Sequence, residues 1–366
     1  FKGAGGRTAR DIVEAIEDAG GQINAATAYE RTSFHIRALK GGLPLAMEVL
    51  SDLILRPTLD AGDLAREKDV VAQEIAEAAD TPDDLVFELA QAKAFEGQPL
   101  GRPILGTVDS IAAAAPDTLG DWRAALYAPD RLVVSAAGAI DEDELLALAE
   151  QAFGAERGTG APEAGTDAFT GGSAPTKRAL EQAHLVAFLP APGATDPDYF
   201  ALRIFAEALG GGMSSRLFQE AREKRGLAYA IDAWAETWAD VGLLGLYAGC
   251  RASDADELAR VAAGEIAALA ATIGEAELAR AKAQLKGHLF MAAERPLVRA
   301  EQSAGQTLLF GQPLTAAALA ADIDAVSPAD IARLGQRLLS PAKSASAVLG
   351  PKAAMGAPEA FERALF

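Results

Sequence analysis

The sequence contains very little cysteine, histidine and aromatic side chain. Among its 366 residues it has one cysteine, three histidines and 6% aromatic residues. The single Cys250 excludes an internal disulfide and fits a reducing compartment, so we expect a cytoplasmic protein. The longest apolar runs, such as VGLLGLYAGC at 241–250, reach about half of the ~20 residues that a membrane helix needs. We therefore expect no membrane span.

Positive charge is also scarce. The chain has 33 Lys and Arg against 52 Asp and Glu, a formal net charge of −19. This balance argues against a nucleic-acid partner, because phosphate backbones are bound by basic surfaces. An acidic surface either attracts basic ligands or only keeps the protein soluble, and composition leaves both open.

An internal repeat divides the chain into similar halves. LAREKDVVAQE (64–74) aligns with LARAKAQLKGH (278–288), and GQPL occurs at 97–100 and again at 311–314, both at an offset of 214 (278 − 64 and 311 − 97). APDRLVVSAAG (128–138) aligns with SPAKSASAVLG (340–350). We predict two homologous α/β domains, residues 1–153 and 178–366, joined by a Gly-, Pro- and Thr-rich linker at 154–177.

Hydrophobic periodicity places the main elements. It predicts an α+β fold in which each domain has a mixed or antiparallel sheet flanked by helices. Helices are expected at 6–20, 44–55, 60–79, 83–95 and 141–153, and on both sides of LGGGMSS (209–215). Strands are expected at 22–39 with a turn in the middle, at 131–140, at 183–190, and as a pair within 227–249.

The helix at 60–79 carries three acids on neighbouring positions of one face. Glu67 and Glu74 are seven residues apart and thus roughly 20° from eclipsed on a helix. A solvated face is the ordinary explanation on spacing alone, and Glu77 stays undecided. At the offset of 214 the second repeat has Ala281 and His288 in place of Glu67 and Glu74 (281 − 67 and 288 − 74). Only the first repeat therefore keeps the acids.

Seven segments carry a resemblance to a known family over nearly the whole chain. They are FKG, GGQINAATAYERTSF, LSDLILRP, EKDVVAQEI, QPLGRPILG, LGGGMSSRLFQEAREKRGLAY and FERALF. Together they resemble the pitrilysin/insulinase family of zinc metallopeptidases, most of all its processing-peptidase-type bacterial members. The resemblance implies a zinc-dependent endopeptidase that cleaves extended peptides or unfolded, presequence-like segments in a closed chamber.

The resemblance also implies a metal site. Glu74 matches the family's third zinc ligand, and Glu67 matches an outer acid that fixes the orientation of a ligand or of metal-bound water. The family's other two ligands, both histidines, and its general-base Glu lie in an inverted H-x-x-E-H motif. That motif is expected upstream of Phe1, with one Zn²⁺ per full-length chain, so the 366-residue chain by itself is expected to be inactive.

Four further residues match substrate-contacting positions of the family. Asn24 and Ala25 match an edge strand that pairs with an extended peptide through backbone hydrogen bonds. Arg222 and Tyr229 match an Arg–Tyr pair that reaches the bound peptide. Arg can donate two hydrogen bonds to a carbonyl, and a Tyr hydroxyl can help to hold a tetrahedral oxyanion.

Assembly and function each keep an alternative. The chain represents half of the family's four-domain chamber, so two chains are expected to pair, as a homodimer in preference to a heterodimer. The rival function is that of a non-catalytic family member, a partner, assembly or peptide-binding subunit. The retained Glu67 and Glu74 favour the enzyme. The scattered His35, His184 and His288 are predicted to pack rather than to bind metal.

Overall fold

The structure is a computed structural model that describes residues 1–154 and 165–366. The described residues fall into two compact units. Unit 1 contains Phe1–Ile75, the described part of Ile104–Ala164, and Ala292–Leu314. Unit 2 contains Ala76–Pro103, Gly165–Met291 and Thr315–Phe366. Each unit therefore draws on both halves of the sequence.

The two units exchange equivalent segments of the repeat. Unit 2 takes residues 76–103 from the first half, and the repeat-equivalent residues are 290–317 (76 + 214 and 103 + 214). Unit 1 takes nearly that segment, 292–314, from the second half. The predicted domain boundaries, 1–153 and 178–366, describe the repeat and stay a prediction. Residues 155–164 of the predicted linker lie outside the described residues, whereas its last residues form a strand, β5 (Gly172–Lys177).

The positions of the helices agree with the duplication. Helix α3 (Ala61–Asp80) and helix α10 (Glu275–Ala293) begin 214 residues apart (275 − 61). Helices α4 (Pro82–Ala94) and α11 (Pro296–Phe310) begin at the same offset (296 − 82). Both α4 and α11 start with a proline, whose missing N–H costs nothing in the first turn. The predicted α+β fold class is confirmed.

Unit 1 surrounds a small hydrophobic core formed by Ala4, Ile12, Ile16, Val49 and Leu53. A capping box between Thr8 and Asp11 closes the start of its first helix and satisfies two otherwise unpaired N–H groups. Besides most of α3 and helix α11, its described elements are β1 (Gly3–Ala4), β2 (Arg7–Thr8), α1 (Ala9–Asp18), β3 (Gln22–Thr27), β4 (Thr32–Arg37), α2 (Leu43–Leu55), α5 (Val108–Ala113), α6 (Pro116–Leu126), η2 (Pro129–Arg131) and α7 (Glu142–Phe153).

Unit 2 is built on a five-stranded sheet of strand order β5-β9-β6-β8-β7. Strands β5 and β9 are parallel and the other neighbours are antiparallel, so the sheet is mixed, as predicted. Besides α4, β5 and α10, its described elements are η1 (Pro99–Gly101), β6 (Ala183–Pro192), α8 (Tyr199–Gly210), η3 (Phe218–Lys224), β7 (Ala228–Thr237), β8 (Val241–Cys250), α9 (Ala255–Ala271), α12 (Ala316–Ala325), α13 (Pro328–Leu339), β9 (Ala345–Gly350), η4 (Lys352–Ala354) and α14 (Ala357–Leu365).

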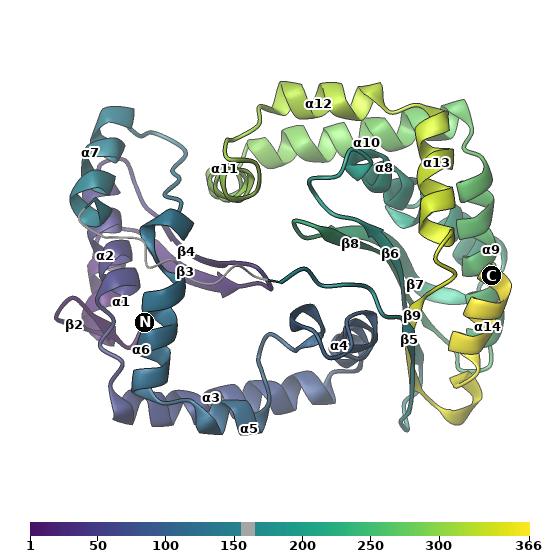
Figure 1. Cartoon of the computed structure of the whole chain (residues 1–366), viewed down its shortest axis with the longest axis horizontal. Coiled ribbons are helices and arrows are strands. Elements are labelled where there is room, and N and C mark those ends of the chain that lie inside the picture. The colour runs from purple at the N-terminus through teal and green to yellow at the C-terminus, as the bar shows by residue number, and fades with distance from the viewer. Residues whose placement is uncertain (155–164) are drawn as a thin grey trace. The chain divides into compact units, whose positions relative to one another are not determined.

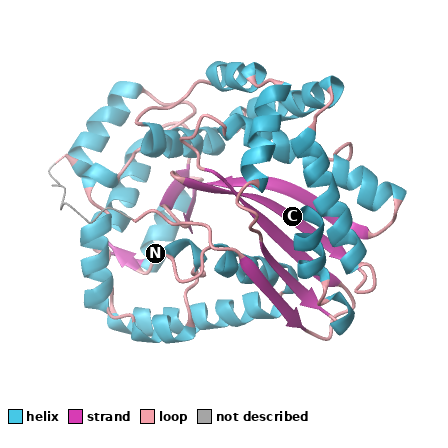
Figure 2. Cartoon of the chain, turned by 45° about the vertical axis from the view of Figure 1, so that its right-hand side comes forward, coloured by secondary structure: helices cyan, strands magenta, loops and turns pink. Residues whose placement is uncertain are grey.

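Both faces of this sheet are covered by helices. Leu185 and Leu189 of β6 point into the main core, which includes buried residues of α8, α9 and α13. Helix α4 packs against β5, β6 and β9, and its Phe87 ring lies 5.4 Å from the Trp234 ring and 5.5 Å from the Tyr247 ring. Figure 1 shows α4 on one side of the sheet and α9, α13 and α14 on the other, and Figure 2 shows the twist of the sheet. Burial on both faces explains the near-continuous apolar sequences of β6 and β8.

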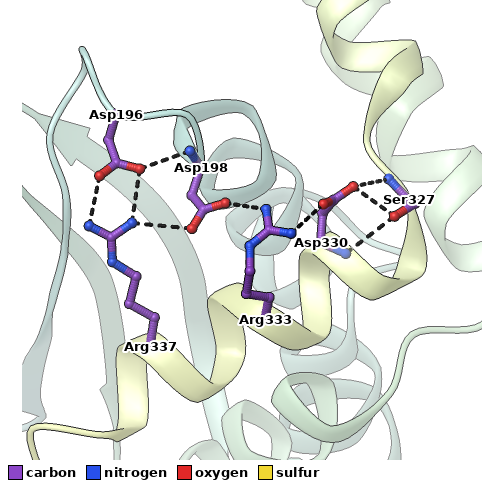
Figure 3. A network of polar contacts seen from close by, with 6 residues as sticks. All are labelled: Asp196, Asp198, Ser327, Asp330, Arg333 and Arg337. Carbon is purple, nitrogen blue, oxygen red and sulfur yellow. Dashed lines mark hydrogen bonds and ion pairs between the residues drawn. The ribbon is translucent and has the colours of Figure 1, made fainter.

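An ion-pair network ties helix α13 to the loop between β6 and α8 (Figure 3). Arg337 donates hydrogen bonds to both oxygens of Asp196, at 2.9 and 2.7 Å, and Arg333 pairs with the buried Asp198. Asp330 receives hydrogen bonds from the backbone and the hydroxyl of Ser327, at 2.8 and 2.7 Å, and these hold its pKa at about 2. The network therefore ties α13, from its first turn to its last, to the loop before α8.

Two predicted elements differ from the structure. Residues 131–140 were expected as a strand. In the structure Arg131 is the last residue of η2, and residues 132–140 pair with no described strand. Leu132 is extended, with φ −115° and ψ 129°, but a strand also needs a hydrogen-bonded neighbour. The repeat-equivalent β9 has two such neighbours, β5 and β6. The helix after LGGGMSS is present, but its residues 218–224 are π-helical.

No helix in the described part of the chain combines the length and the apolar character needed to cross a membrane.

Candidate active site

The FKG turn is held by a buried acid on α2. Arg7 Nη1 donates to Asp52 Oδ2 at 2.6 Å, Asp52 is 4% exposed, and the N–H of Gly5 donates to the carbonyl of Arg56 at 3.0 Å. Gly5 has a φ of 60°, and a Cβ there would lie 2.0 Å from Asp52 Oδ2. Only glycine fits this position. The turn is thus anchored at its base and presents Lys2 at a defined place.

Lys2 forms an ion pair with one of the predicted site acids. Its Nζ lies 2.8 Å from Glu67 Oε1, with the two side chains 53% and 39% exposed. An exposed pair of this kind stabilises the fold by no more than about 1 kcal/mol. Its effect is therefore mainly to orient the Glu67 carboxylate and to supply a compensating positive charge.

Glu74 lies two turns after Glu67 on α3 and is exposed. Neither a hydrogen bond nor an ion pair joins its carboxylate to another described residue, which leaves it free to bind a ligand. A helix rises about 1.5 Å per residue, so seven residues separate the two Cα atoms by roughly 10 Å along the axis. Glu77 is also exposed, and the structure gives it no further role.

These residues do not complete a zinc site by themselves. Among the described residues no three His, Cys, Asp or Glu side chains are grouped so that they could hold a metal ion. Structural and catalytic zinc sites use at least three protein ligands. The described chain thus offers Glu74 as one ligand, Glu67 as an acid on the same helix, and no full donor set.

Asn24 and Ala25 lie on strand β3, which pairs only with β4 among the described strands. The other edge of β3 therefore has no strand partner there, as a peptide-binding edge requires. The Asn24 side chain is exposed and its Oδ1 accepts the N–H of Ala25 at 2.8 Å. An incoming strand that used this N–H would have to displace the Asn24 amide.

Two of the three histidines, His35 and His184, lie in packed positions. His35 is opposite Asn24 on β4, and its Nδ1 lies 3.9 Å from Glu301 Oε1 of α11. His184 Nδ1 and the Tyr247 hydroxyl lie 3.0 Å apart inside the layer under α4. Burial lowers the pKa of His184 and raises the pKa of Tyr247 to about 12. His288 lies on α10.

Arg222 and Tyr229 lie together in unit 2. The Cζ atom of Arg222 is 5.7 Å from the centroid of the Tyr229 ring, within the range of a cation–π contact. Arg222 is on the π-helix η3, and Tyr229 is on β7, the edge strand of the sheet. Tyr229 is 77% exposed, so its hydroxyl is accessible to a ligand.

Two irregularities that sequence periodicity missed direct this pair outward. The register of β7 on β8 shifts between Ala228 and Ala230, so Tyr229 is the extra residue of a β-bulge. The preceding helix is wound with π-type hydrogen bonds. Bulges and π-helical turns are enriched at functional sites because they re-aim side chains. The only sequence signal for this site was the FQEAREKRGLAY segment, which carries the family resemblance. Phe218 of this segment also contacts Arg222.

Each predicted pair is brought together within one unit. Glu67 and Glu74 share one helix face in unit 1, and Arg222 and Tyr229 make a direct contact in unit 2. The roles assigned to these residues stay predictions.

Two protein-family models match the chain in succession. Residues 1–108 match the model described as insulinase (peptidase family M16), and residues 114–285 match the one described as peptidase M16 inactive domain.

Several named relatives match the chain at high coverage. The chain is 36% identical over 360 residues to an "uncharacterized zinc protease" of Mycobacterium leprae, covering 96% of this chain and 81% of the relative. It is 36% identical over 361 residues to one of Streptomyces coelicolor, covering 96% and 78%. It is 32% identical over 347 residues to "uncharacterized zinc protease YmxG" of Bacillus subtilis, covering 93% and 83%.

A solved structure has the same fold. The crystal structure of a peptidase M16 inactive domain from Pseudomonas fluorescens matches with a TM-score of 0.83 at 19% identity, over 96% of this chain and 86% of that one.

Proposed function

This chain belongs to the insulinase family, peptidase family M16, and we propose that it is a zinc-dependent endopeptidase acting on extended peptides or unfolded, presequence-like segments. Its relatives are named zinc proteases, which supports a peptidase that uses Zn²⁺. The observation that carries the proposal is the acid pair of α3. Glu74 is exposed and without a partner among the described residues, and Glu67 is held two turns earlier by Lys2.

The proposed zinc site needs donors beyond these residues. Since the described chain offers one carboxylate ligand, we propose that the two histidines and the general-base Glu of the inverted motif lie outside the 366 residues. When bound, the metal would supply Lewis-acid activation of a peptide carbonyl and of water. Without those ligands the 366-residue chain is proposed to bind zinc poorly and to be inactive.

The residues of this chain would then bind and orient the peptide. The free edge of β3 would pair with an extended segment through backbone hydrogen bonds, beside Asn24 and Ala25. Arg222 would donate to a peptide carbonyl, and the Tyr229 hydroxyl would donate to the oxygen that becomes negative. Binding through backbone groups favours unfolded segments, and the net charge of −19 favours basic ones.

We also propose that two chains pair as a homodimer that encloses the site. Both kinds of site residue, Glu74 and Arg222, are present in this chain, so no second type of subunit is required to supply them. Light scattering on the protein encoded by the complete gene should give about twice the chain mass. A stable monomer that digests folded proteins would contradict the enclosed site.

Peptide cleavage by that same complete protein tests the proposed activity. We expect about one zinc per chain, cleavage of a flexible basic peptide, loss of cleavage on chelation, and recovery with added Zn²⁺. A compact folded protein of similar charge should resist. Peptides with N-methylated backbone amides at alternate positions should be cleaved more slowly, because strand pairing loses hydrogen bonds. Absence of both zinc and cleavage would refute the proposed activity.

A non-catalytic member of the family is the second candidate. The observation that favours it is that residues 114–285 match the model of the inactive domain, and such a chain would serve as a partner, assembly or peptide-binding subunit. It predicts peptide binding without zinc and without turnover, and the experiment above separates the two.

A further inference from the structure

Arg222 is in contact with a second aromatic ring besides that of Tyr229. Its Cζ atom lies 4.7 Å from the centroid of the Phe218 ring, closer than the 5.7 Å to Tyr229. We propose that Phe218 is a positioning residue that holds the Arg222 guanidinium for the peptide. This proposal rests on the proposed substrate role of Arg222 and adds a residue to it.

The other charges of this segment leave Arg222 without an acid partner. Glu220 is bound by Lys224 at 2.8 Å and by Arg225 at 2.9 Å. The Arg222 guanidinium makes neither a hydrogen bond nor an ion pair with any residue in the described ranges, and the residue is exposed. It lies against the two rings of Phe218 and Tyr229. The N–H donors of the guanidinium thus stay available, because a cation–π contact uses the charge and not the donors.

Fixing an exposed arginine has an entropic cost that these rings reduce. A free arginine side chain samples many rotamers, and binding a peptide would have to offset the entropy lost when it is held in one of them. A ring already in contact with the guanidinium restricts it before the peptide arrives. Phe218 is half-buried, and the neighbouring Leu217 and Ala221 are fully buried. The Phe218 ring therefore stands on a fixed part of η3.

Hydrogen bonds before and after η3 hold this helix and β7 in place around the pair. Arg216, just before η3, donates two hydrogen bonds to Glu277, at 2.7 and 2.8 Å. After η3 the N–H of Leu227 donates to the carbonyl of Ala221 at 2.9 Å. Gly226, with a φ of 62°, turns the chain back into β7. Phe218 and Tyr229 are therefore supported from both ends of the segment.

Substitutions at Phe218 separate an aromatic contact from simple packing. Phe218→Leu keeps an apolar side chain but removes the π face, whereas Phe218→Tyr keeps the face. We expect Phe218→Ala and Phe218→Leu to raise KM for a flexible peptide roughly 5-fold with kcat nearly unchanged, the size of a cation–π contact at an exposed site. Phe218→Tyr should keep the KM of the unsubstituted protein. Met213→Ala, at an exposed apolar residue of the preceding loop, should change neither constant.

A double-mutant cycle with Arg222→Ala, carried out on the protein encoded by the complete gene, provides the decisive test. If Phe218 acts through Arg222, Phe218→Ala should have no further effect once Arg222 is alanine. An equal loss in both backgrounds, or an equal loss in Phe218→Ala and Phe218→Tyr, would overturn the proposal while leaving the role of Arg222 standing. An unchanged KM in Phe218→Ala would overturn it as well. An Arg222→Ala variant with normal kinetics would instead refute the role of Arg222, and the proposal with it.

Discussion

Lys2 Nζ lies 2.8 Å from Glu67 Oε1, and this contact joins the FKG turn to helix α3. Glu67 is thus the oriented acid of the pair, and Glu74, two turns later, is the one without a described partner. We therefore expect Glu67→Gln to weaken zinc binding or turnover by about 10- to 100-fold without abolishing either, as is usual for a residue that orients a metal ligand. Zinc titration of the complete protein measures this. Loss of all bound zinc in Glu67→Gln would instead make Glu67 a ligand.

Variants of the second unit should affect turnover and not metal content. Tyr229→Phe removes a donor to the developing oxyanion, and such a loss costs on the order of 10²–10³ in kcat. Arg222→Ala should lower kcat/KM with zinc content unchanged. Peptide cleavage and metal analysis on the same samples check both statements. Normal kinetics in both variants would show that Arg222 and Tyr229 are a surface arginine and a surface tyrosine without a role in peptide cleavage.

Acid should remove the contribution of Asp330 to stability. Its pKa is lowered to about 2 in the folded chain by hydrogen bonds from Ser327, against roughly 3.9 when unfolded. A lowered pKa means that the contribution is fully present above about pH 4 and is lost as the pH falls toward 2. Asp330→Asn should therefore lower the free energy of unfolding by about 1 kcal/mol at pH 7, as for the loss of a helix cap.

Urea unfolding at several pH values measures that difference. The gap between the unsubstituted protein and Asp330→Asn should close near pH 2. Asp322→Asn, at an exposed acid of α12, is the matched control and should show no gap at any pH. A gap that persists undiminished in acid would show that the Asp330 carboxylate is not responsible.

Cys250 should be nearly unreactive in the folded protein. It is 3% exposed at the end of β8, and burial raises its pKa to about 12. At pH 8 the thiolate fraction is then about 10⁻⁴, against roughly a quarter for an unperturbed thiol. Reaction with an aromatic disulfide reagent should be at least about 10³-fold slower than in denaturant. Rapid modification of the native protein would contradict the burial of this strand end.

Local patterns predicted much of the fold. The 3.6-residue periodicity of α1, α2, α3, α4 and α7 and the turn between β3 and β4 depend on neighbouring residues, which the sequence displays directly. The repeat offset located equivalent helices as well. The exchange of α4 and α11 between the units was not predictable, because it depends on contacts between residues more than a hundred positions apart.

The site was predictable to a similar degree. The positions of Glu67 and Glu74 on one helix face follow from their spacing. The contact between Arg222 and Tyr229 follows less directly, since it needs the π-helix and the bulge. A π-helical turn has nearly the same sequence pattern as an α-helical one, and a bulge is visible only against the register of its partner strand. Residues 131–140 failed as a strand for the same reason, because pairing is a property of two segments.

Zinc content of the Glu74→Gln protein is the most direct test of the central claim, that Glu74 is a ligand of a peptidase's zinc. We expect the complete protein to hold about one zinc per chain and to cleave a flexible peptide, and Glu74→Gln to lose both, because a neutral amide is a poor zinc ligand. Asp69→Asn, an exposed acid on another face of α3, should keep both. Tight stoichiometric zinc and normal turnover in Glu74→Gln would contradict the assignment.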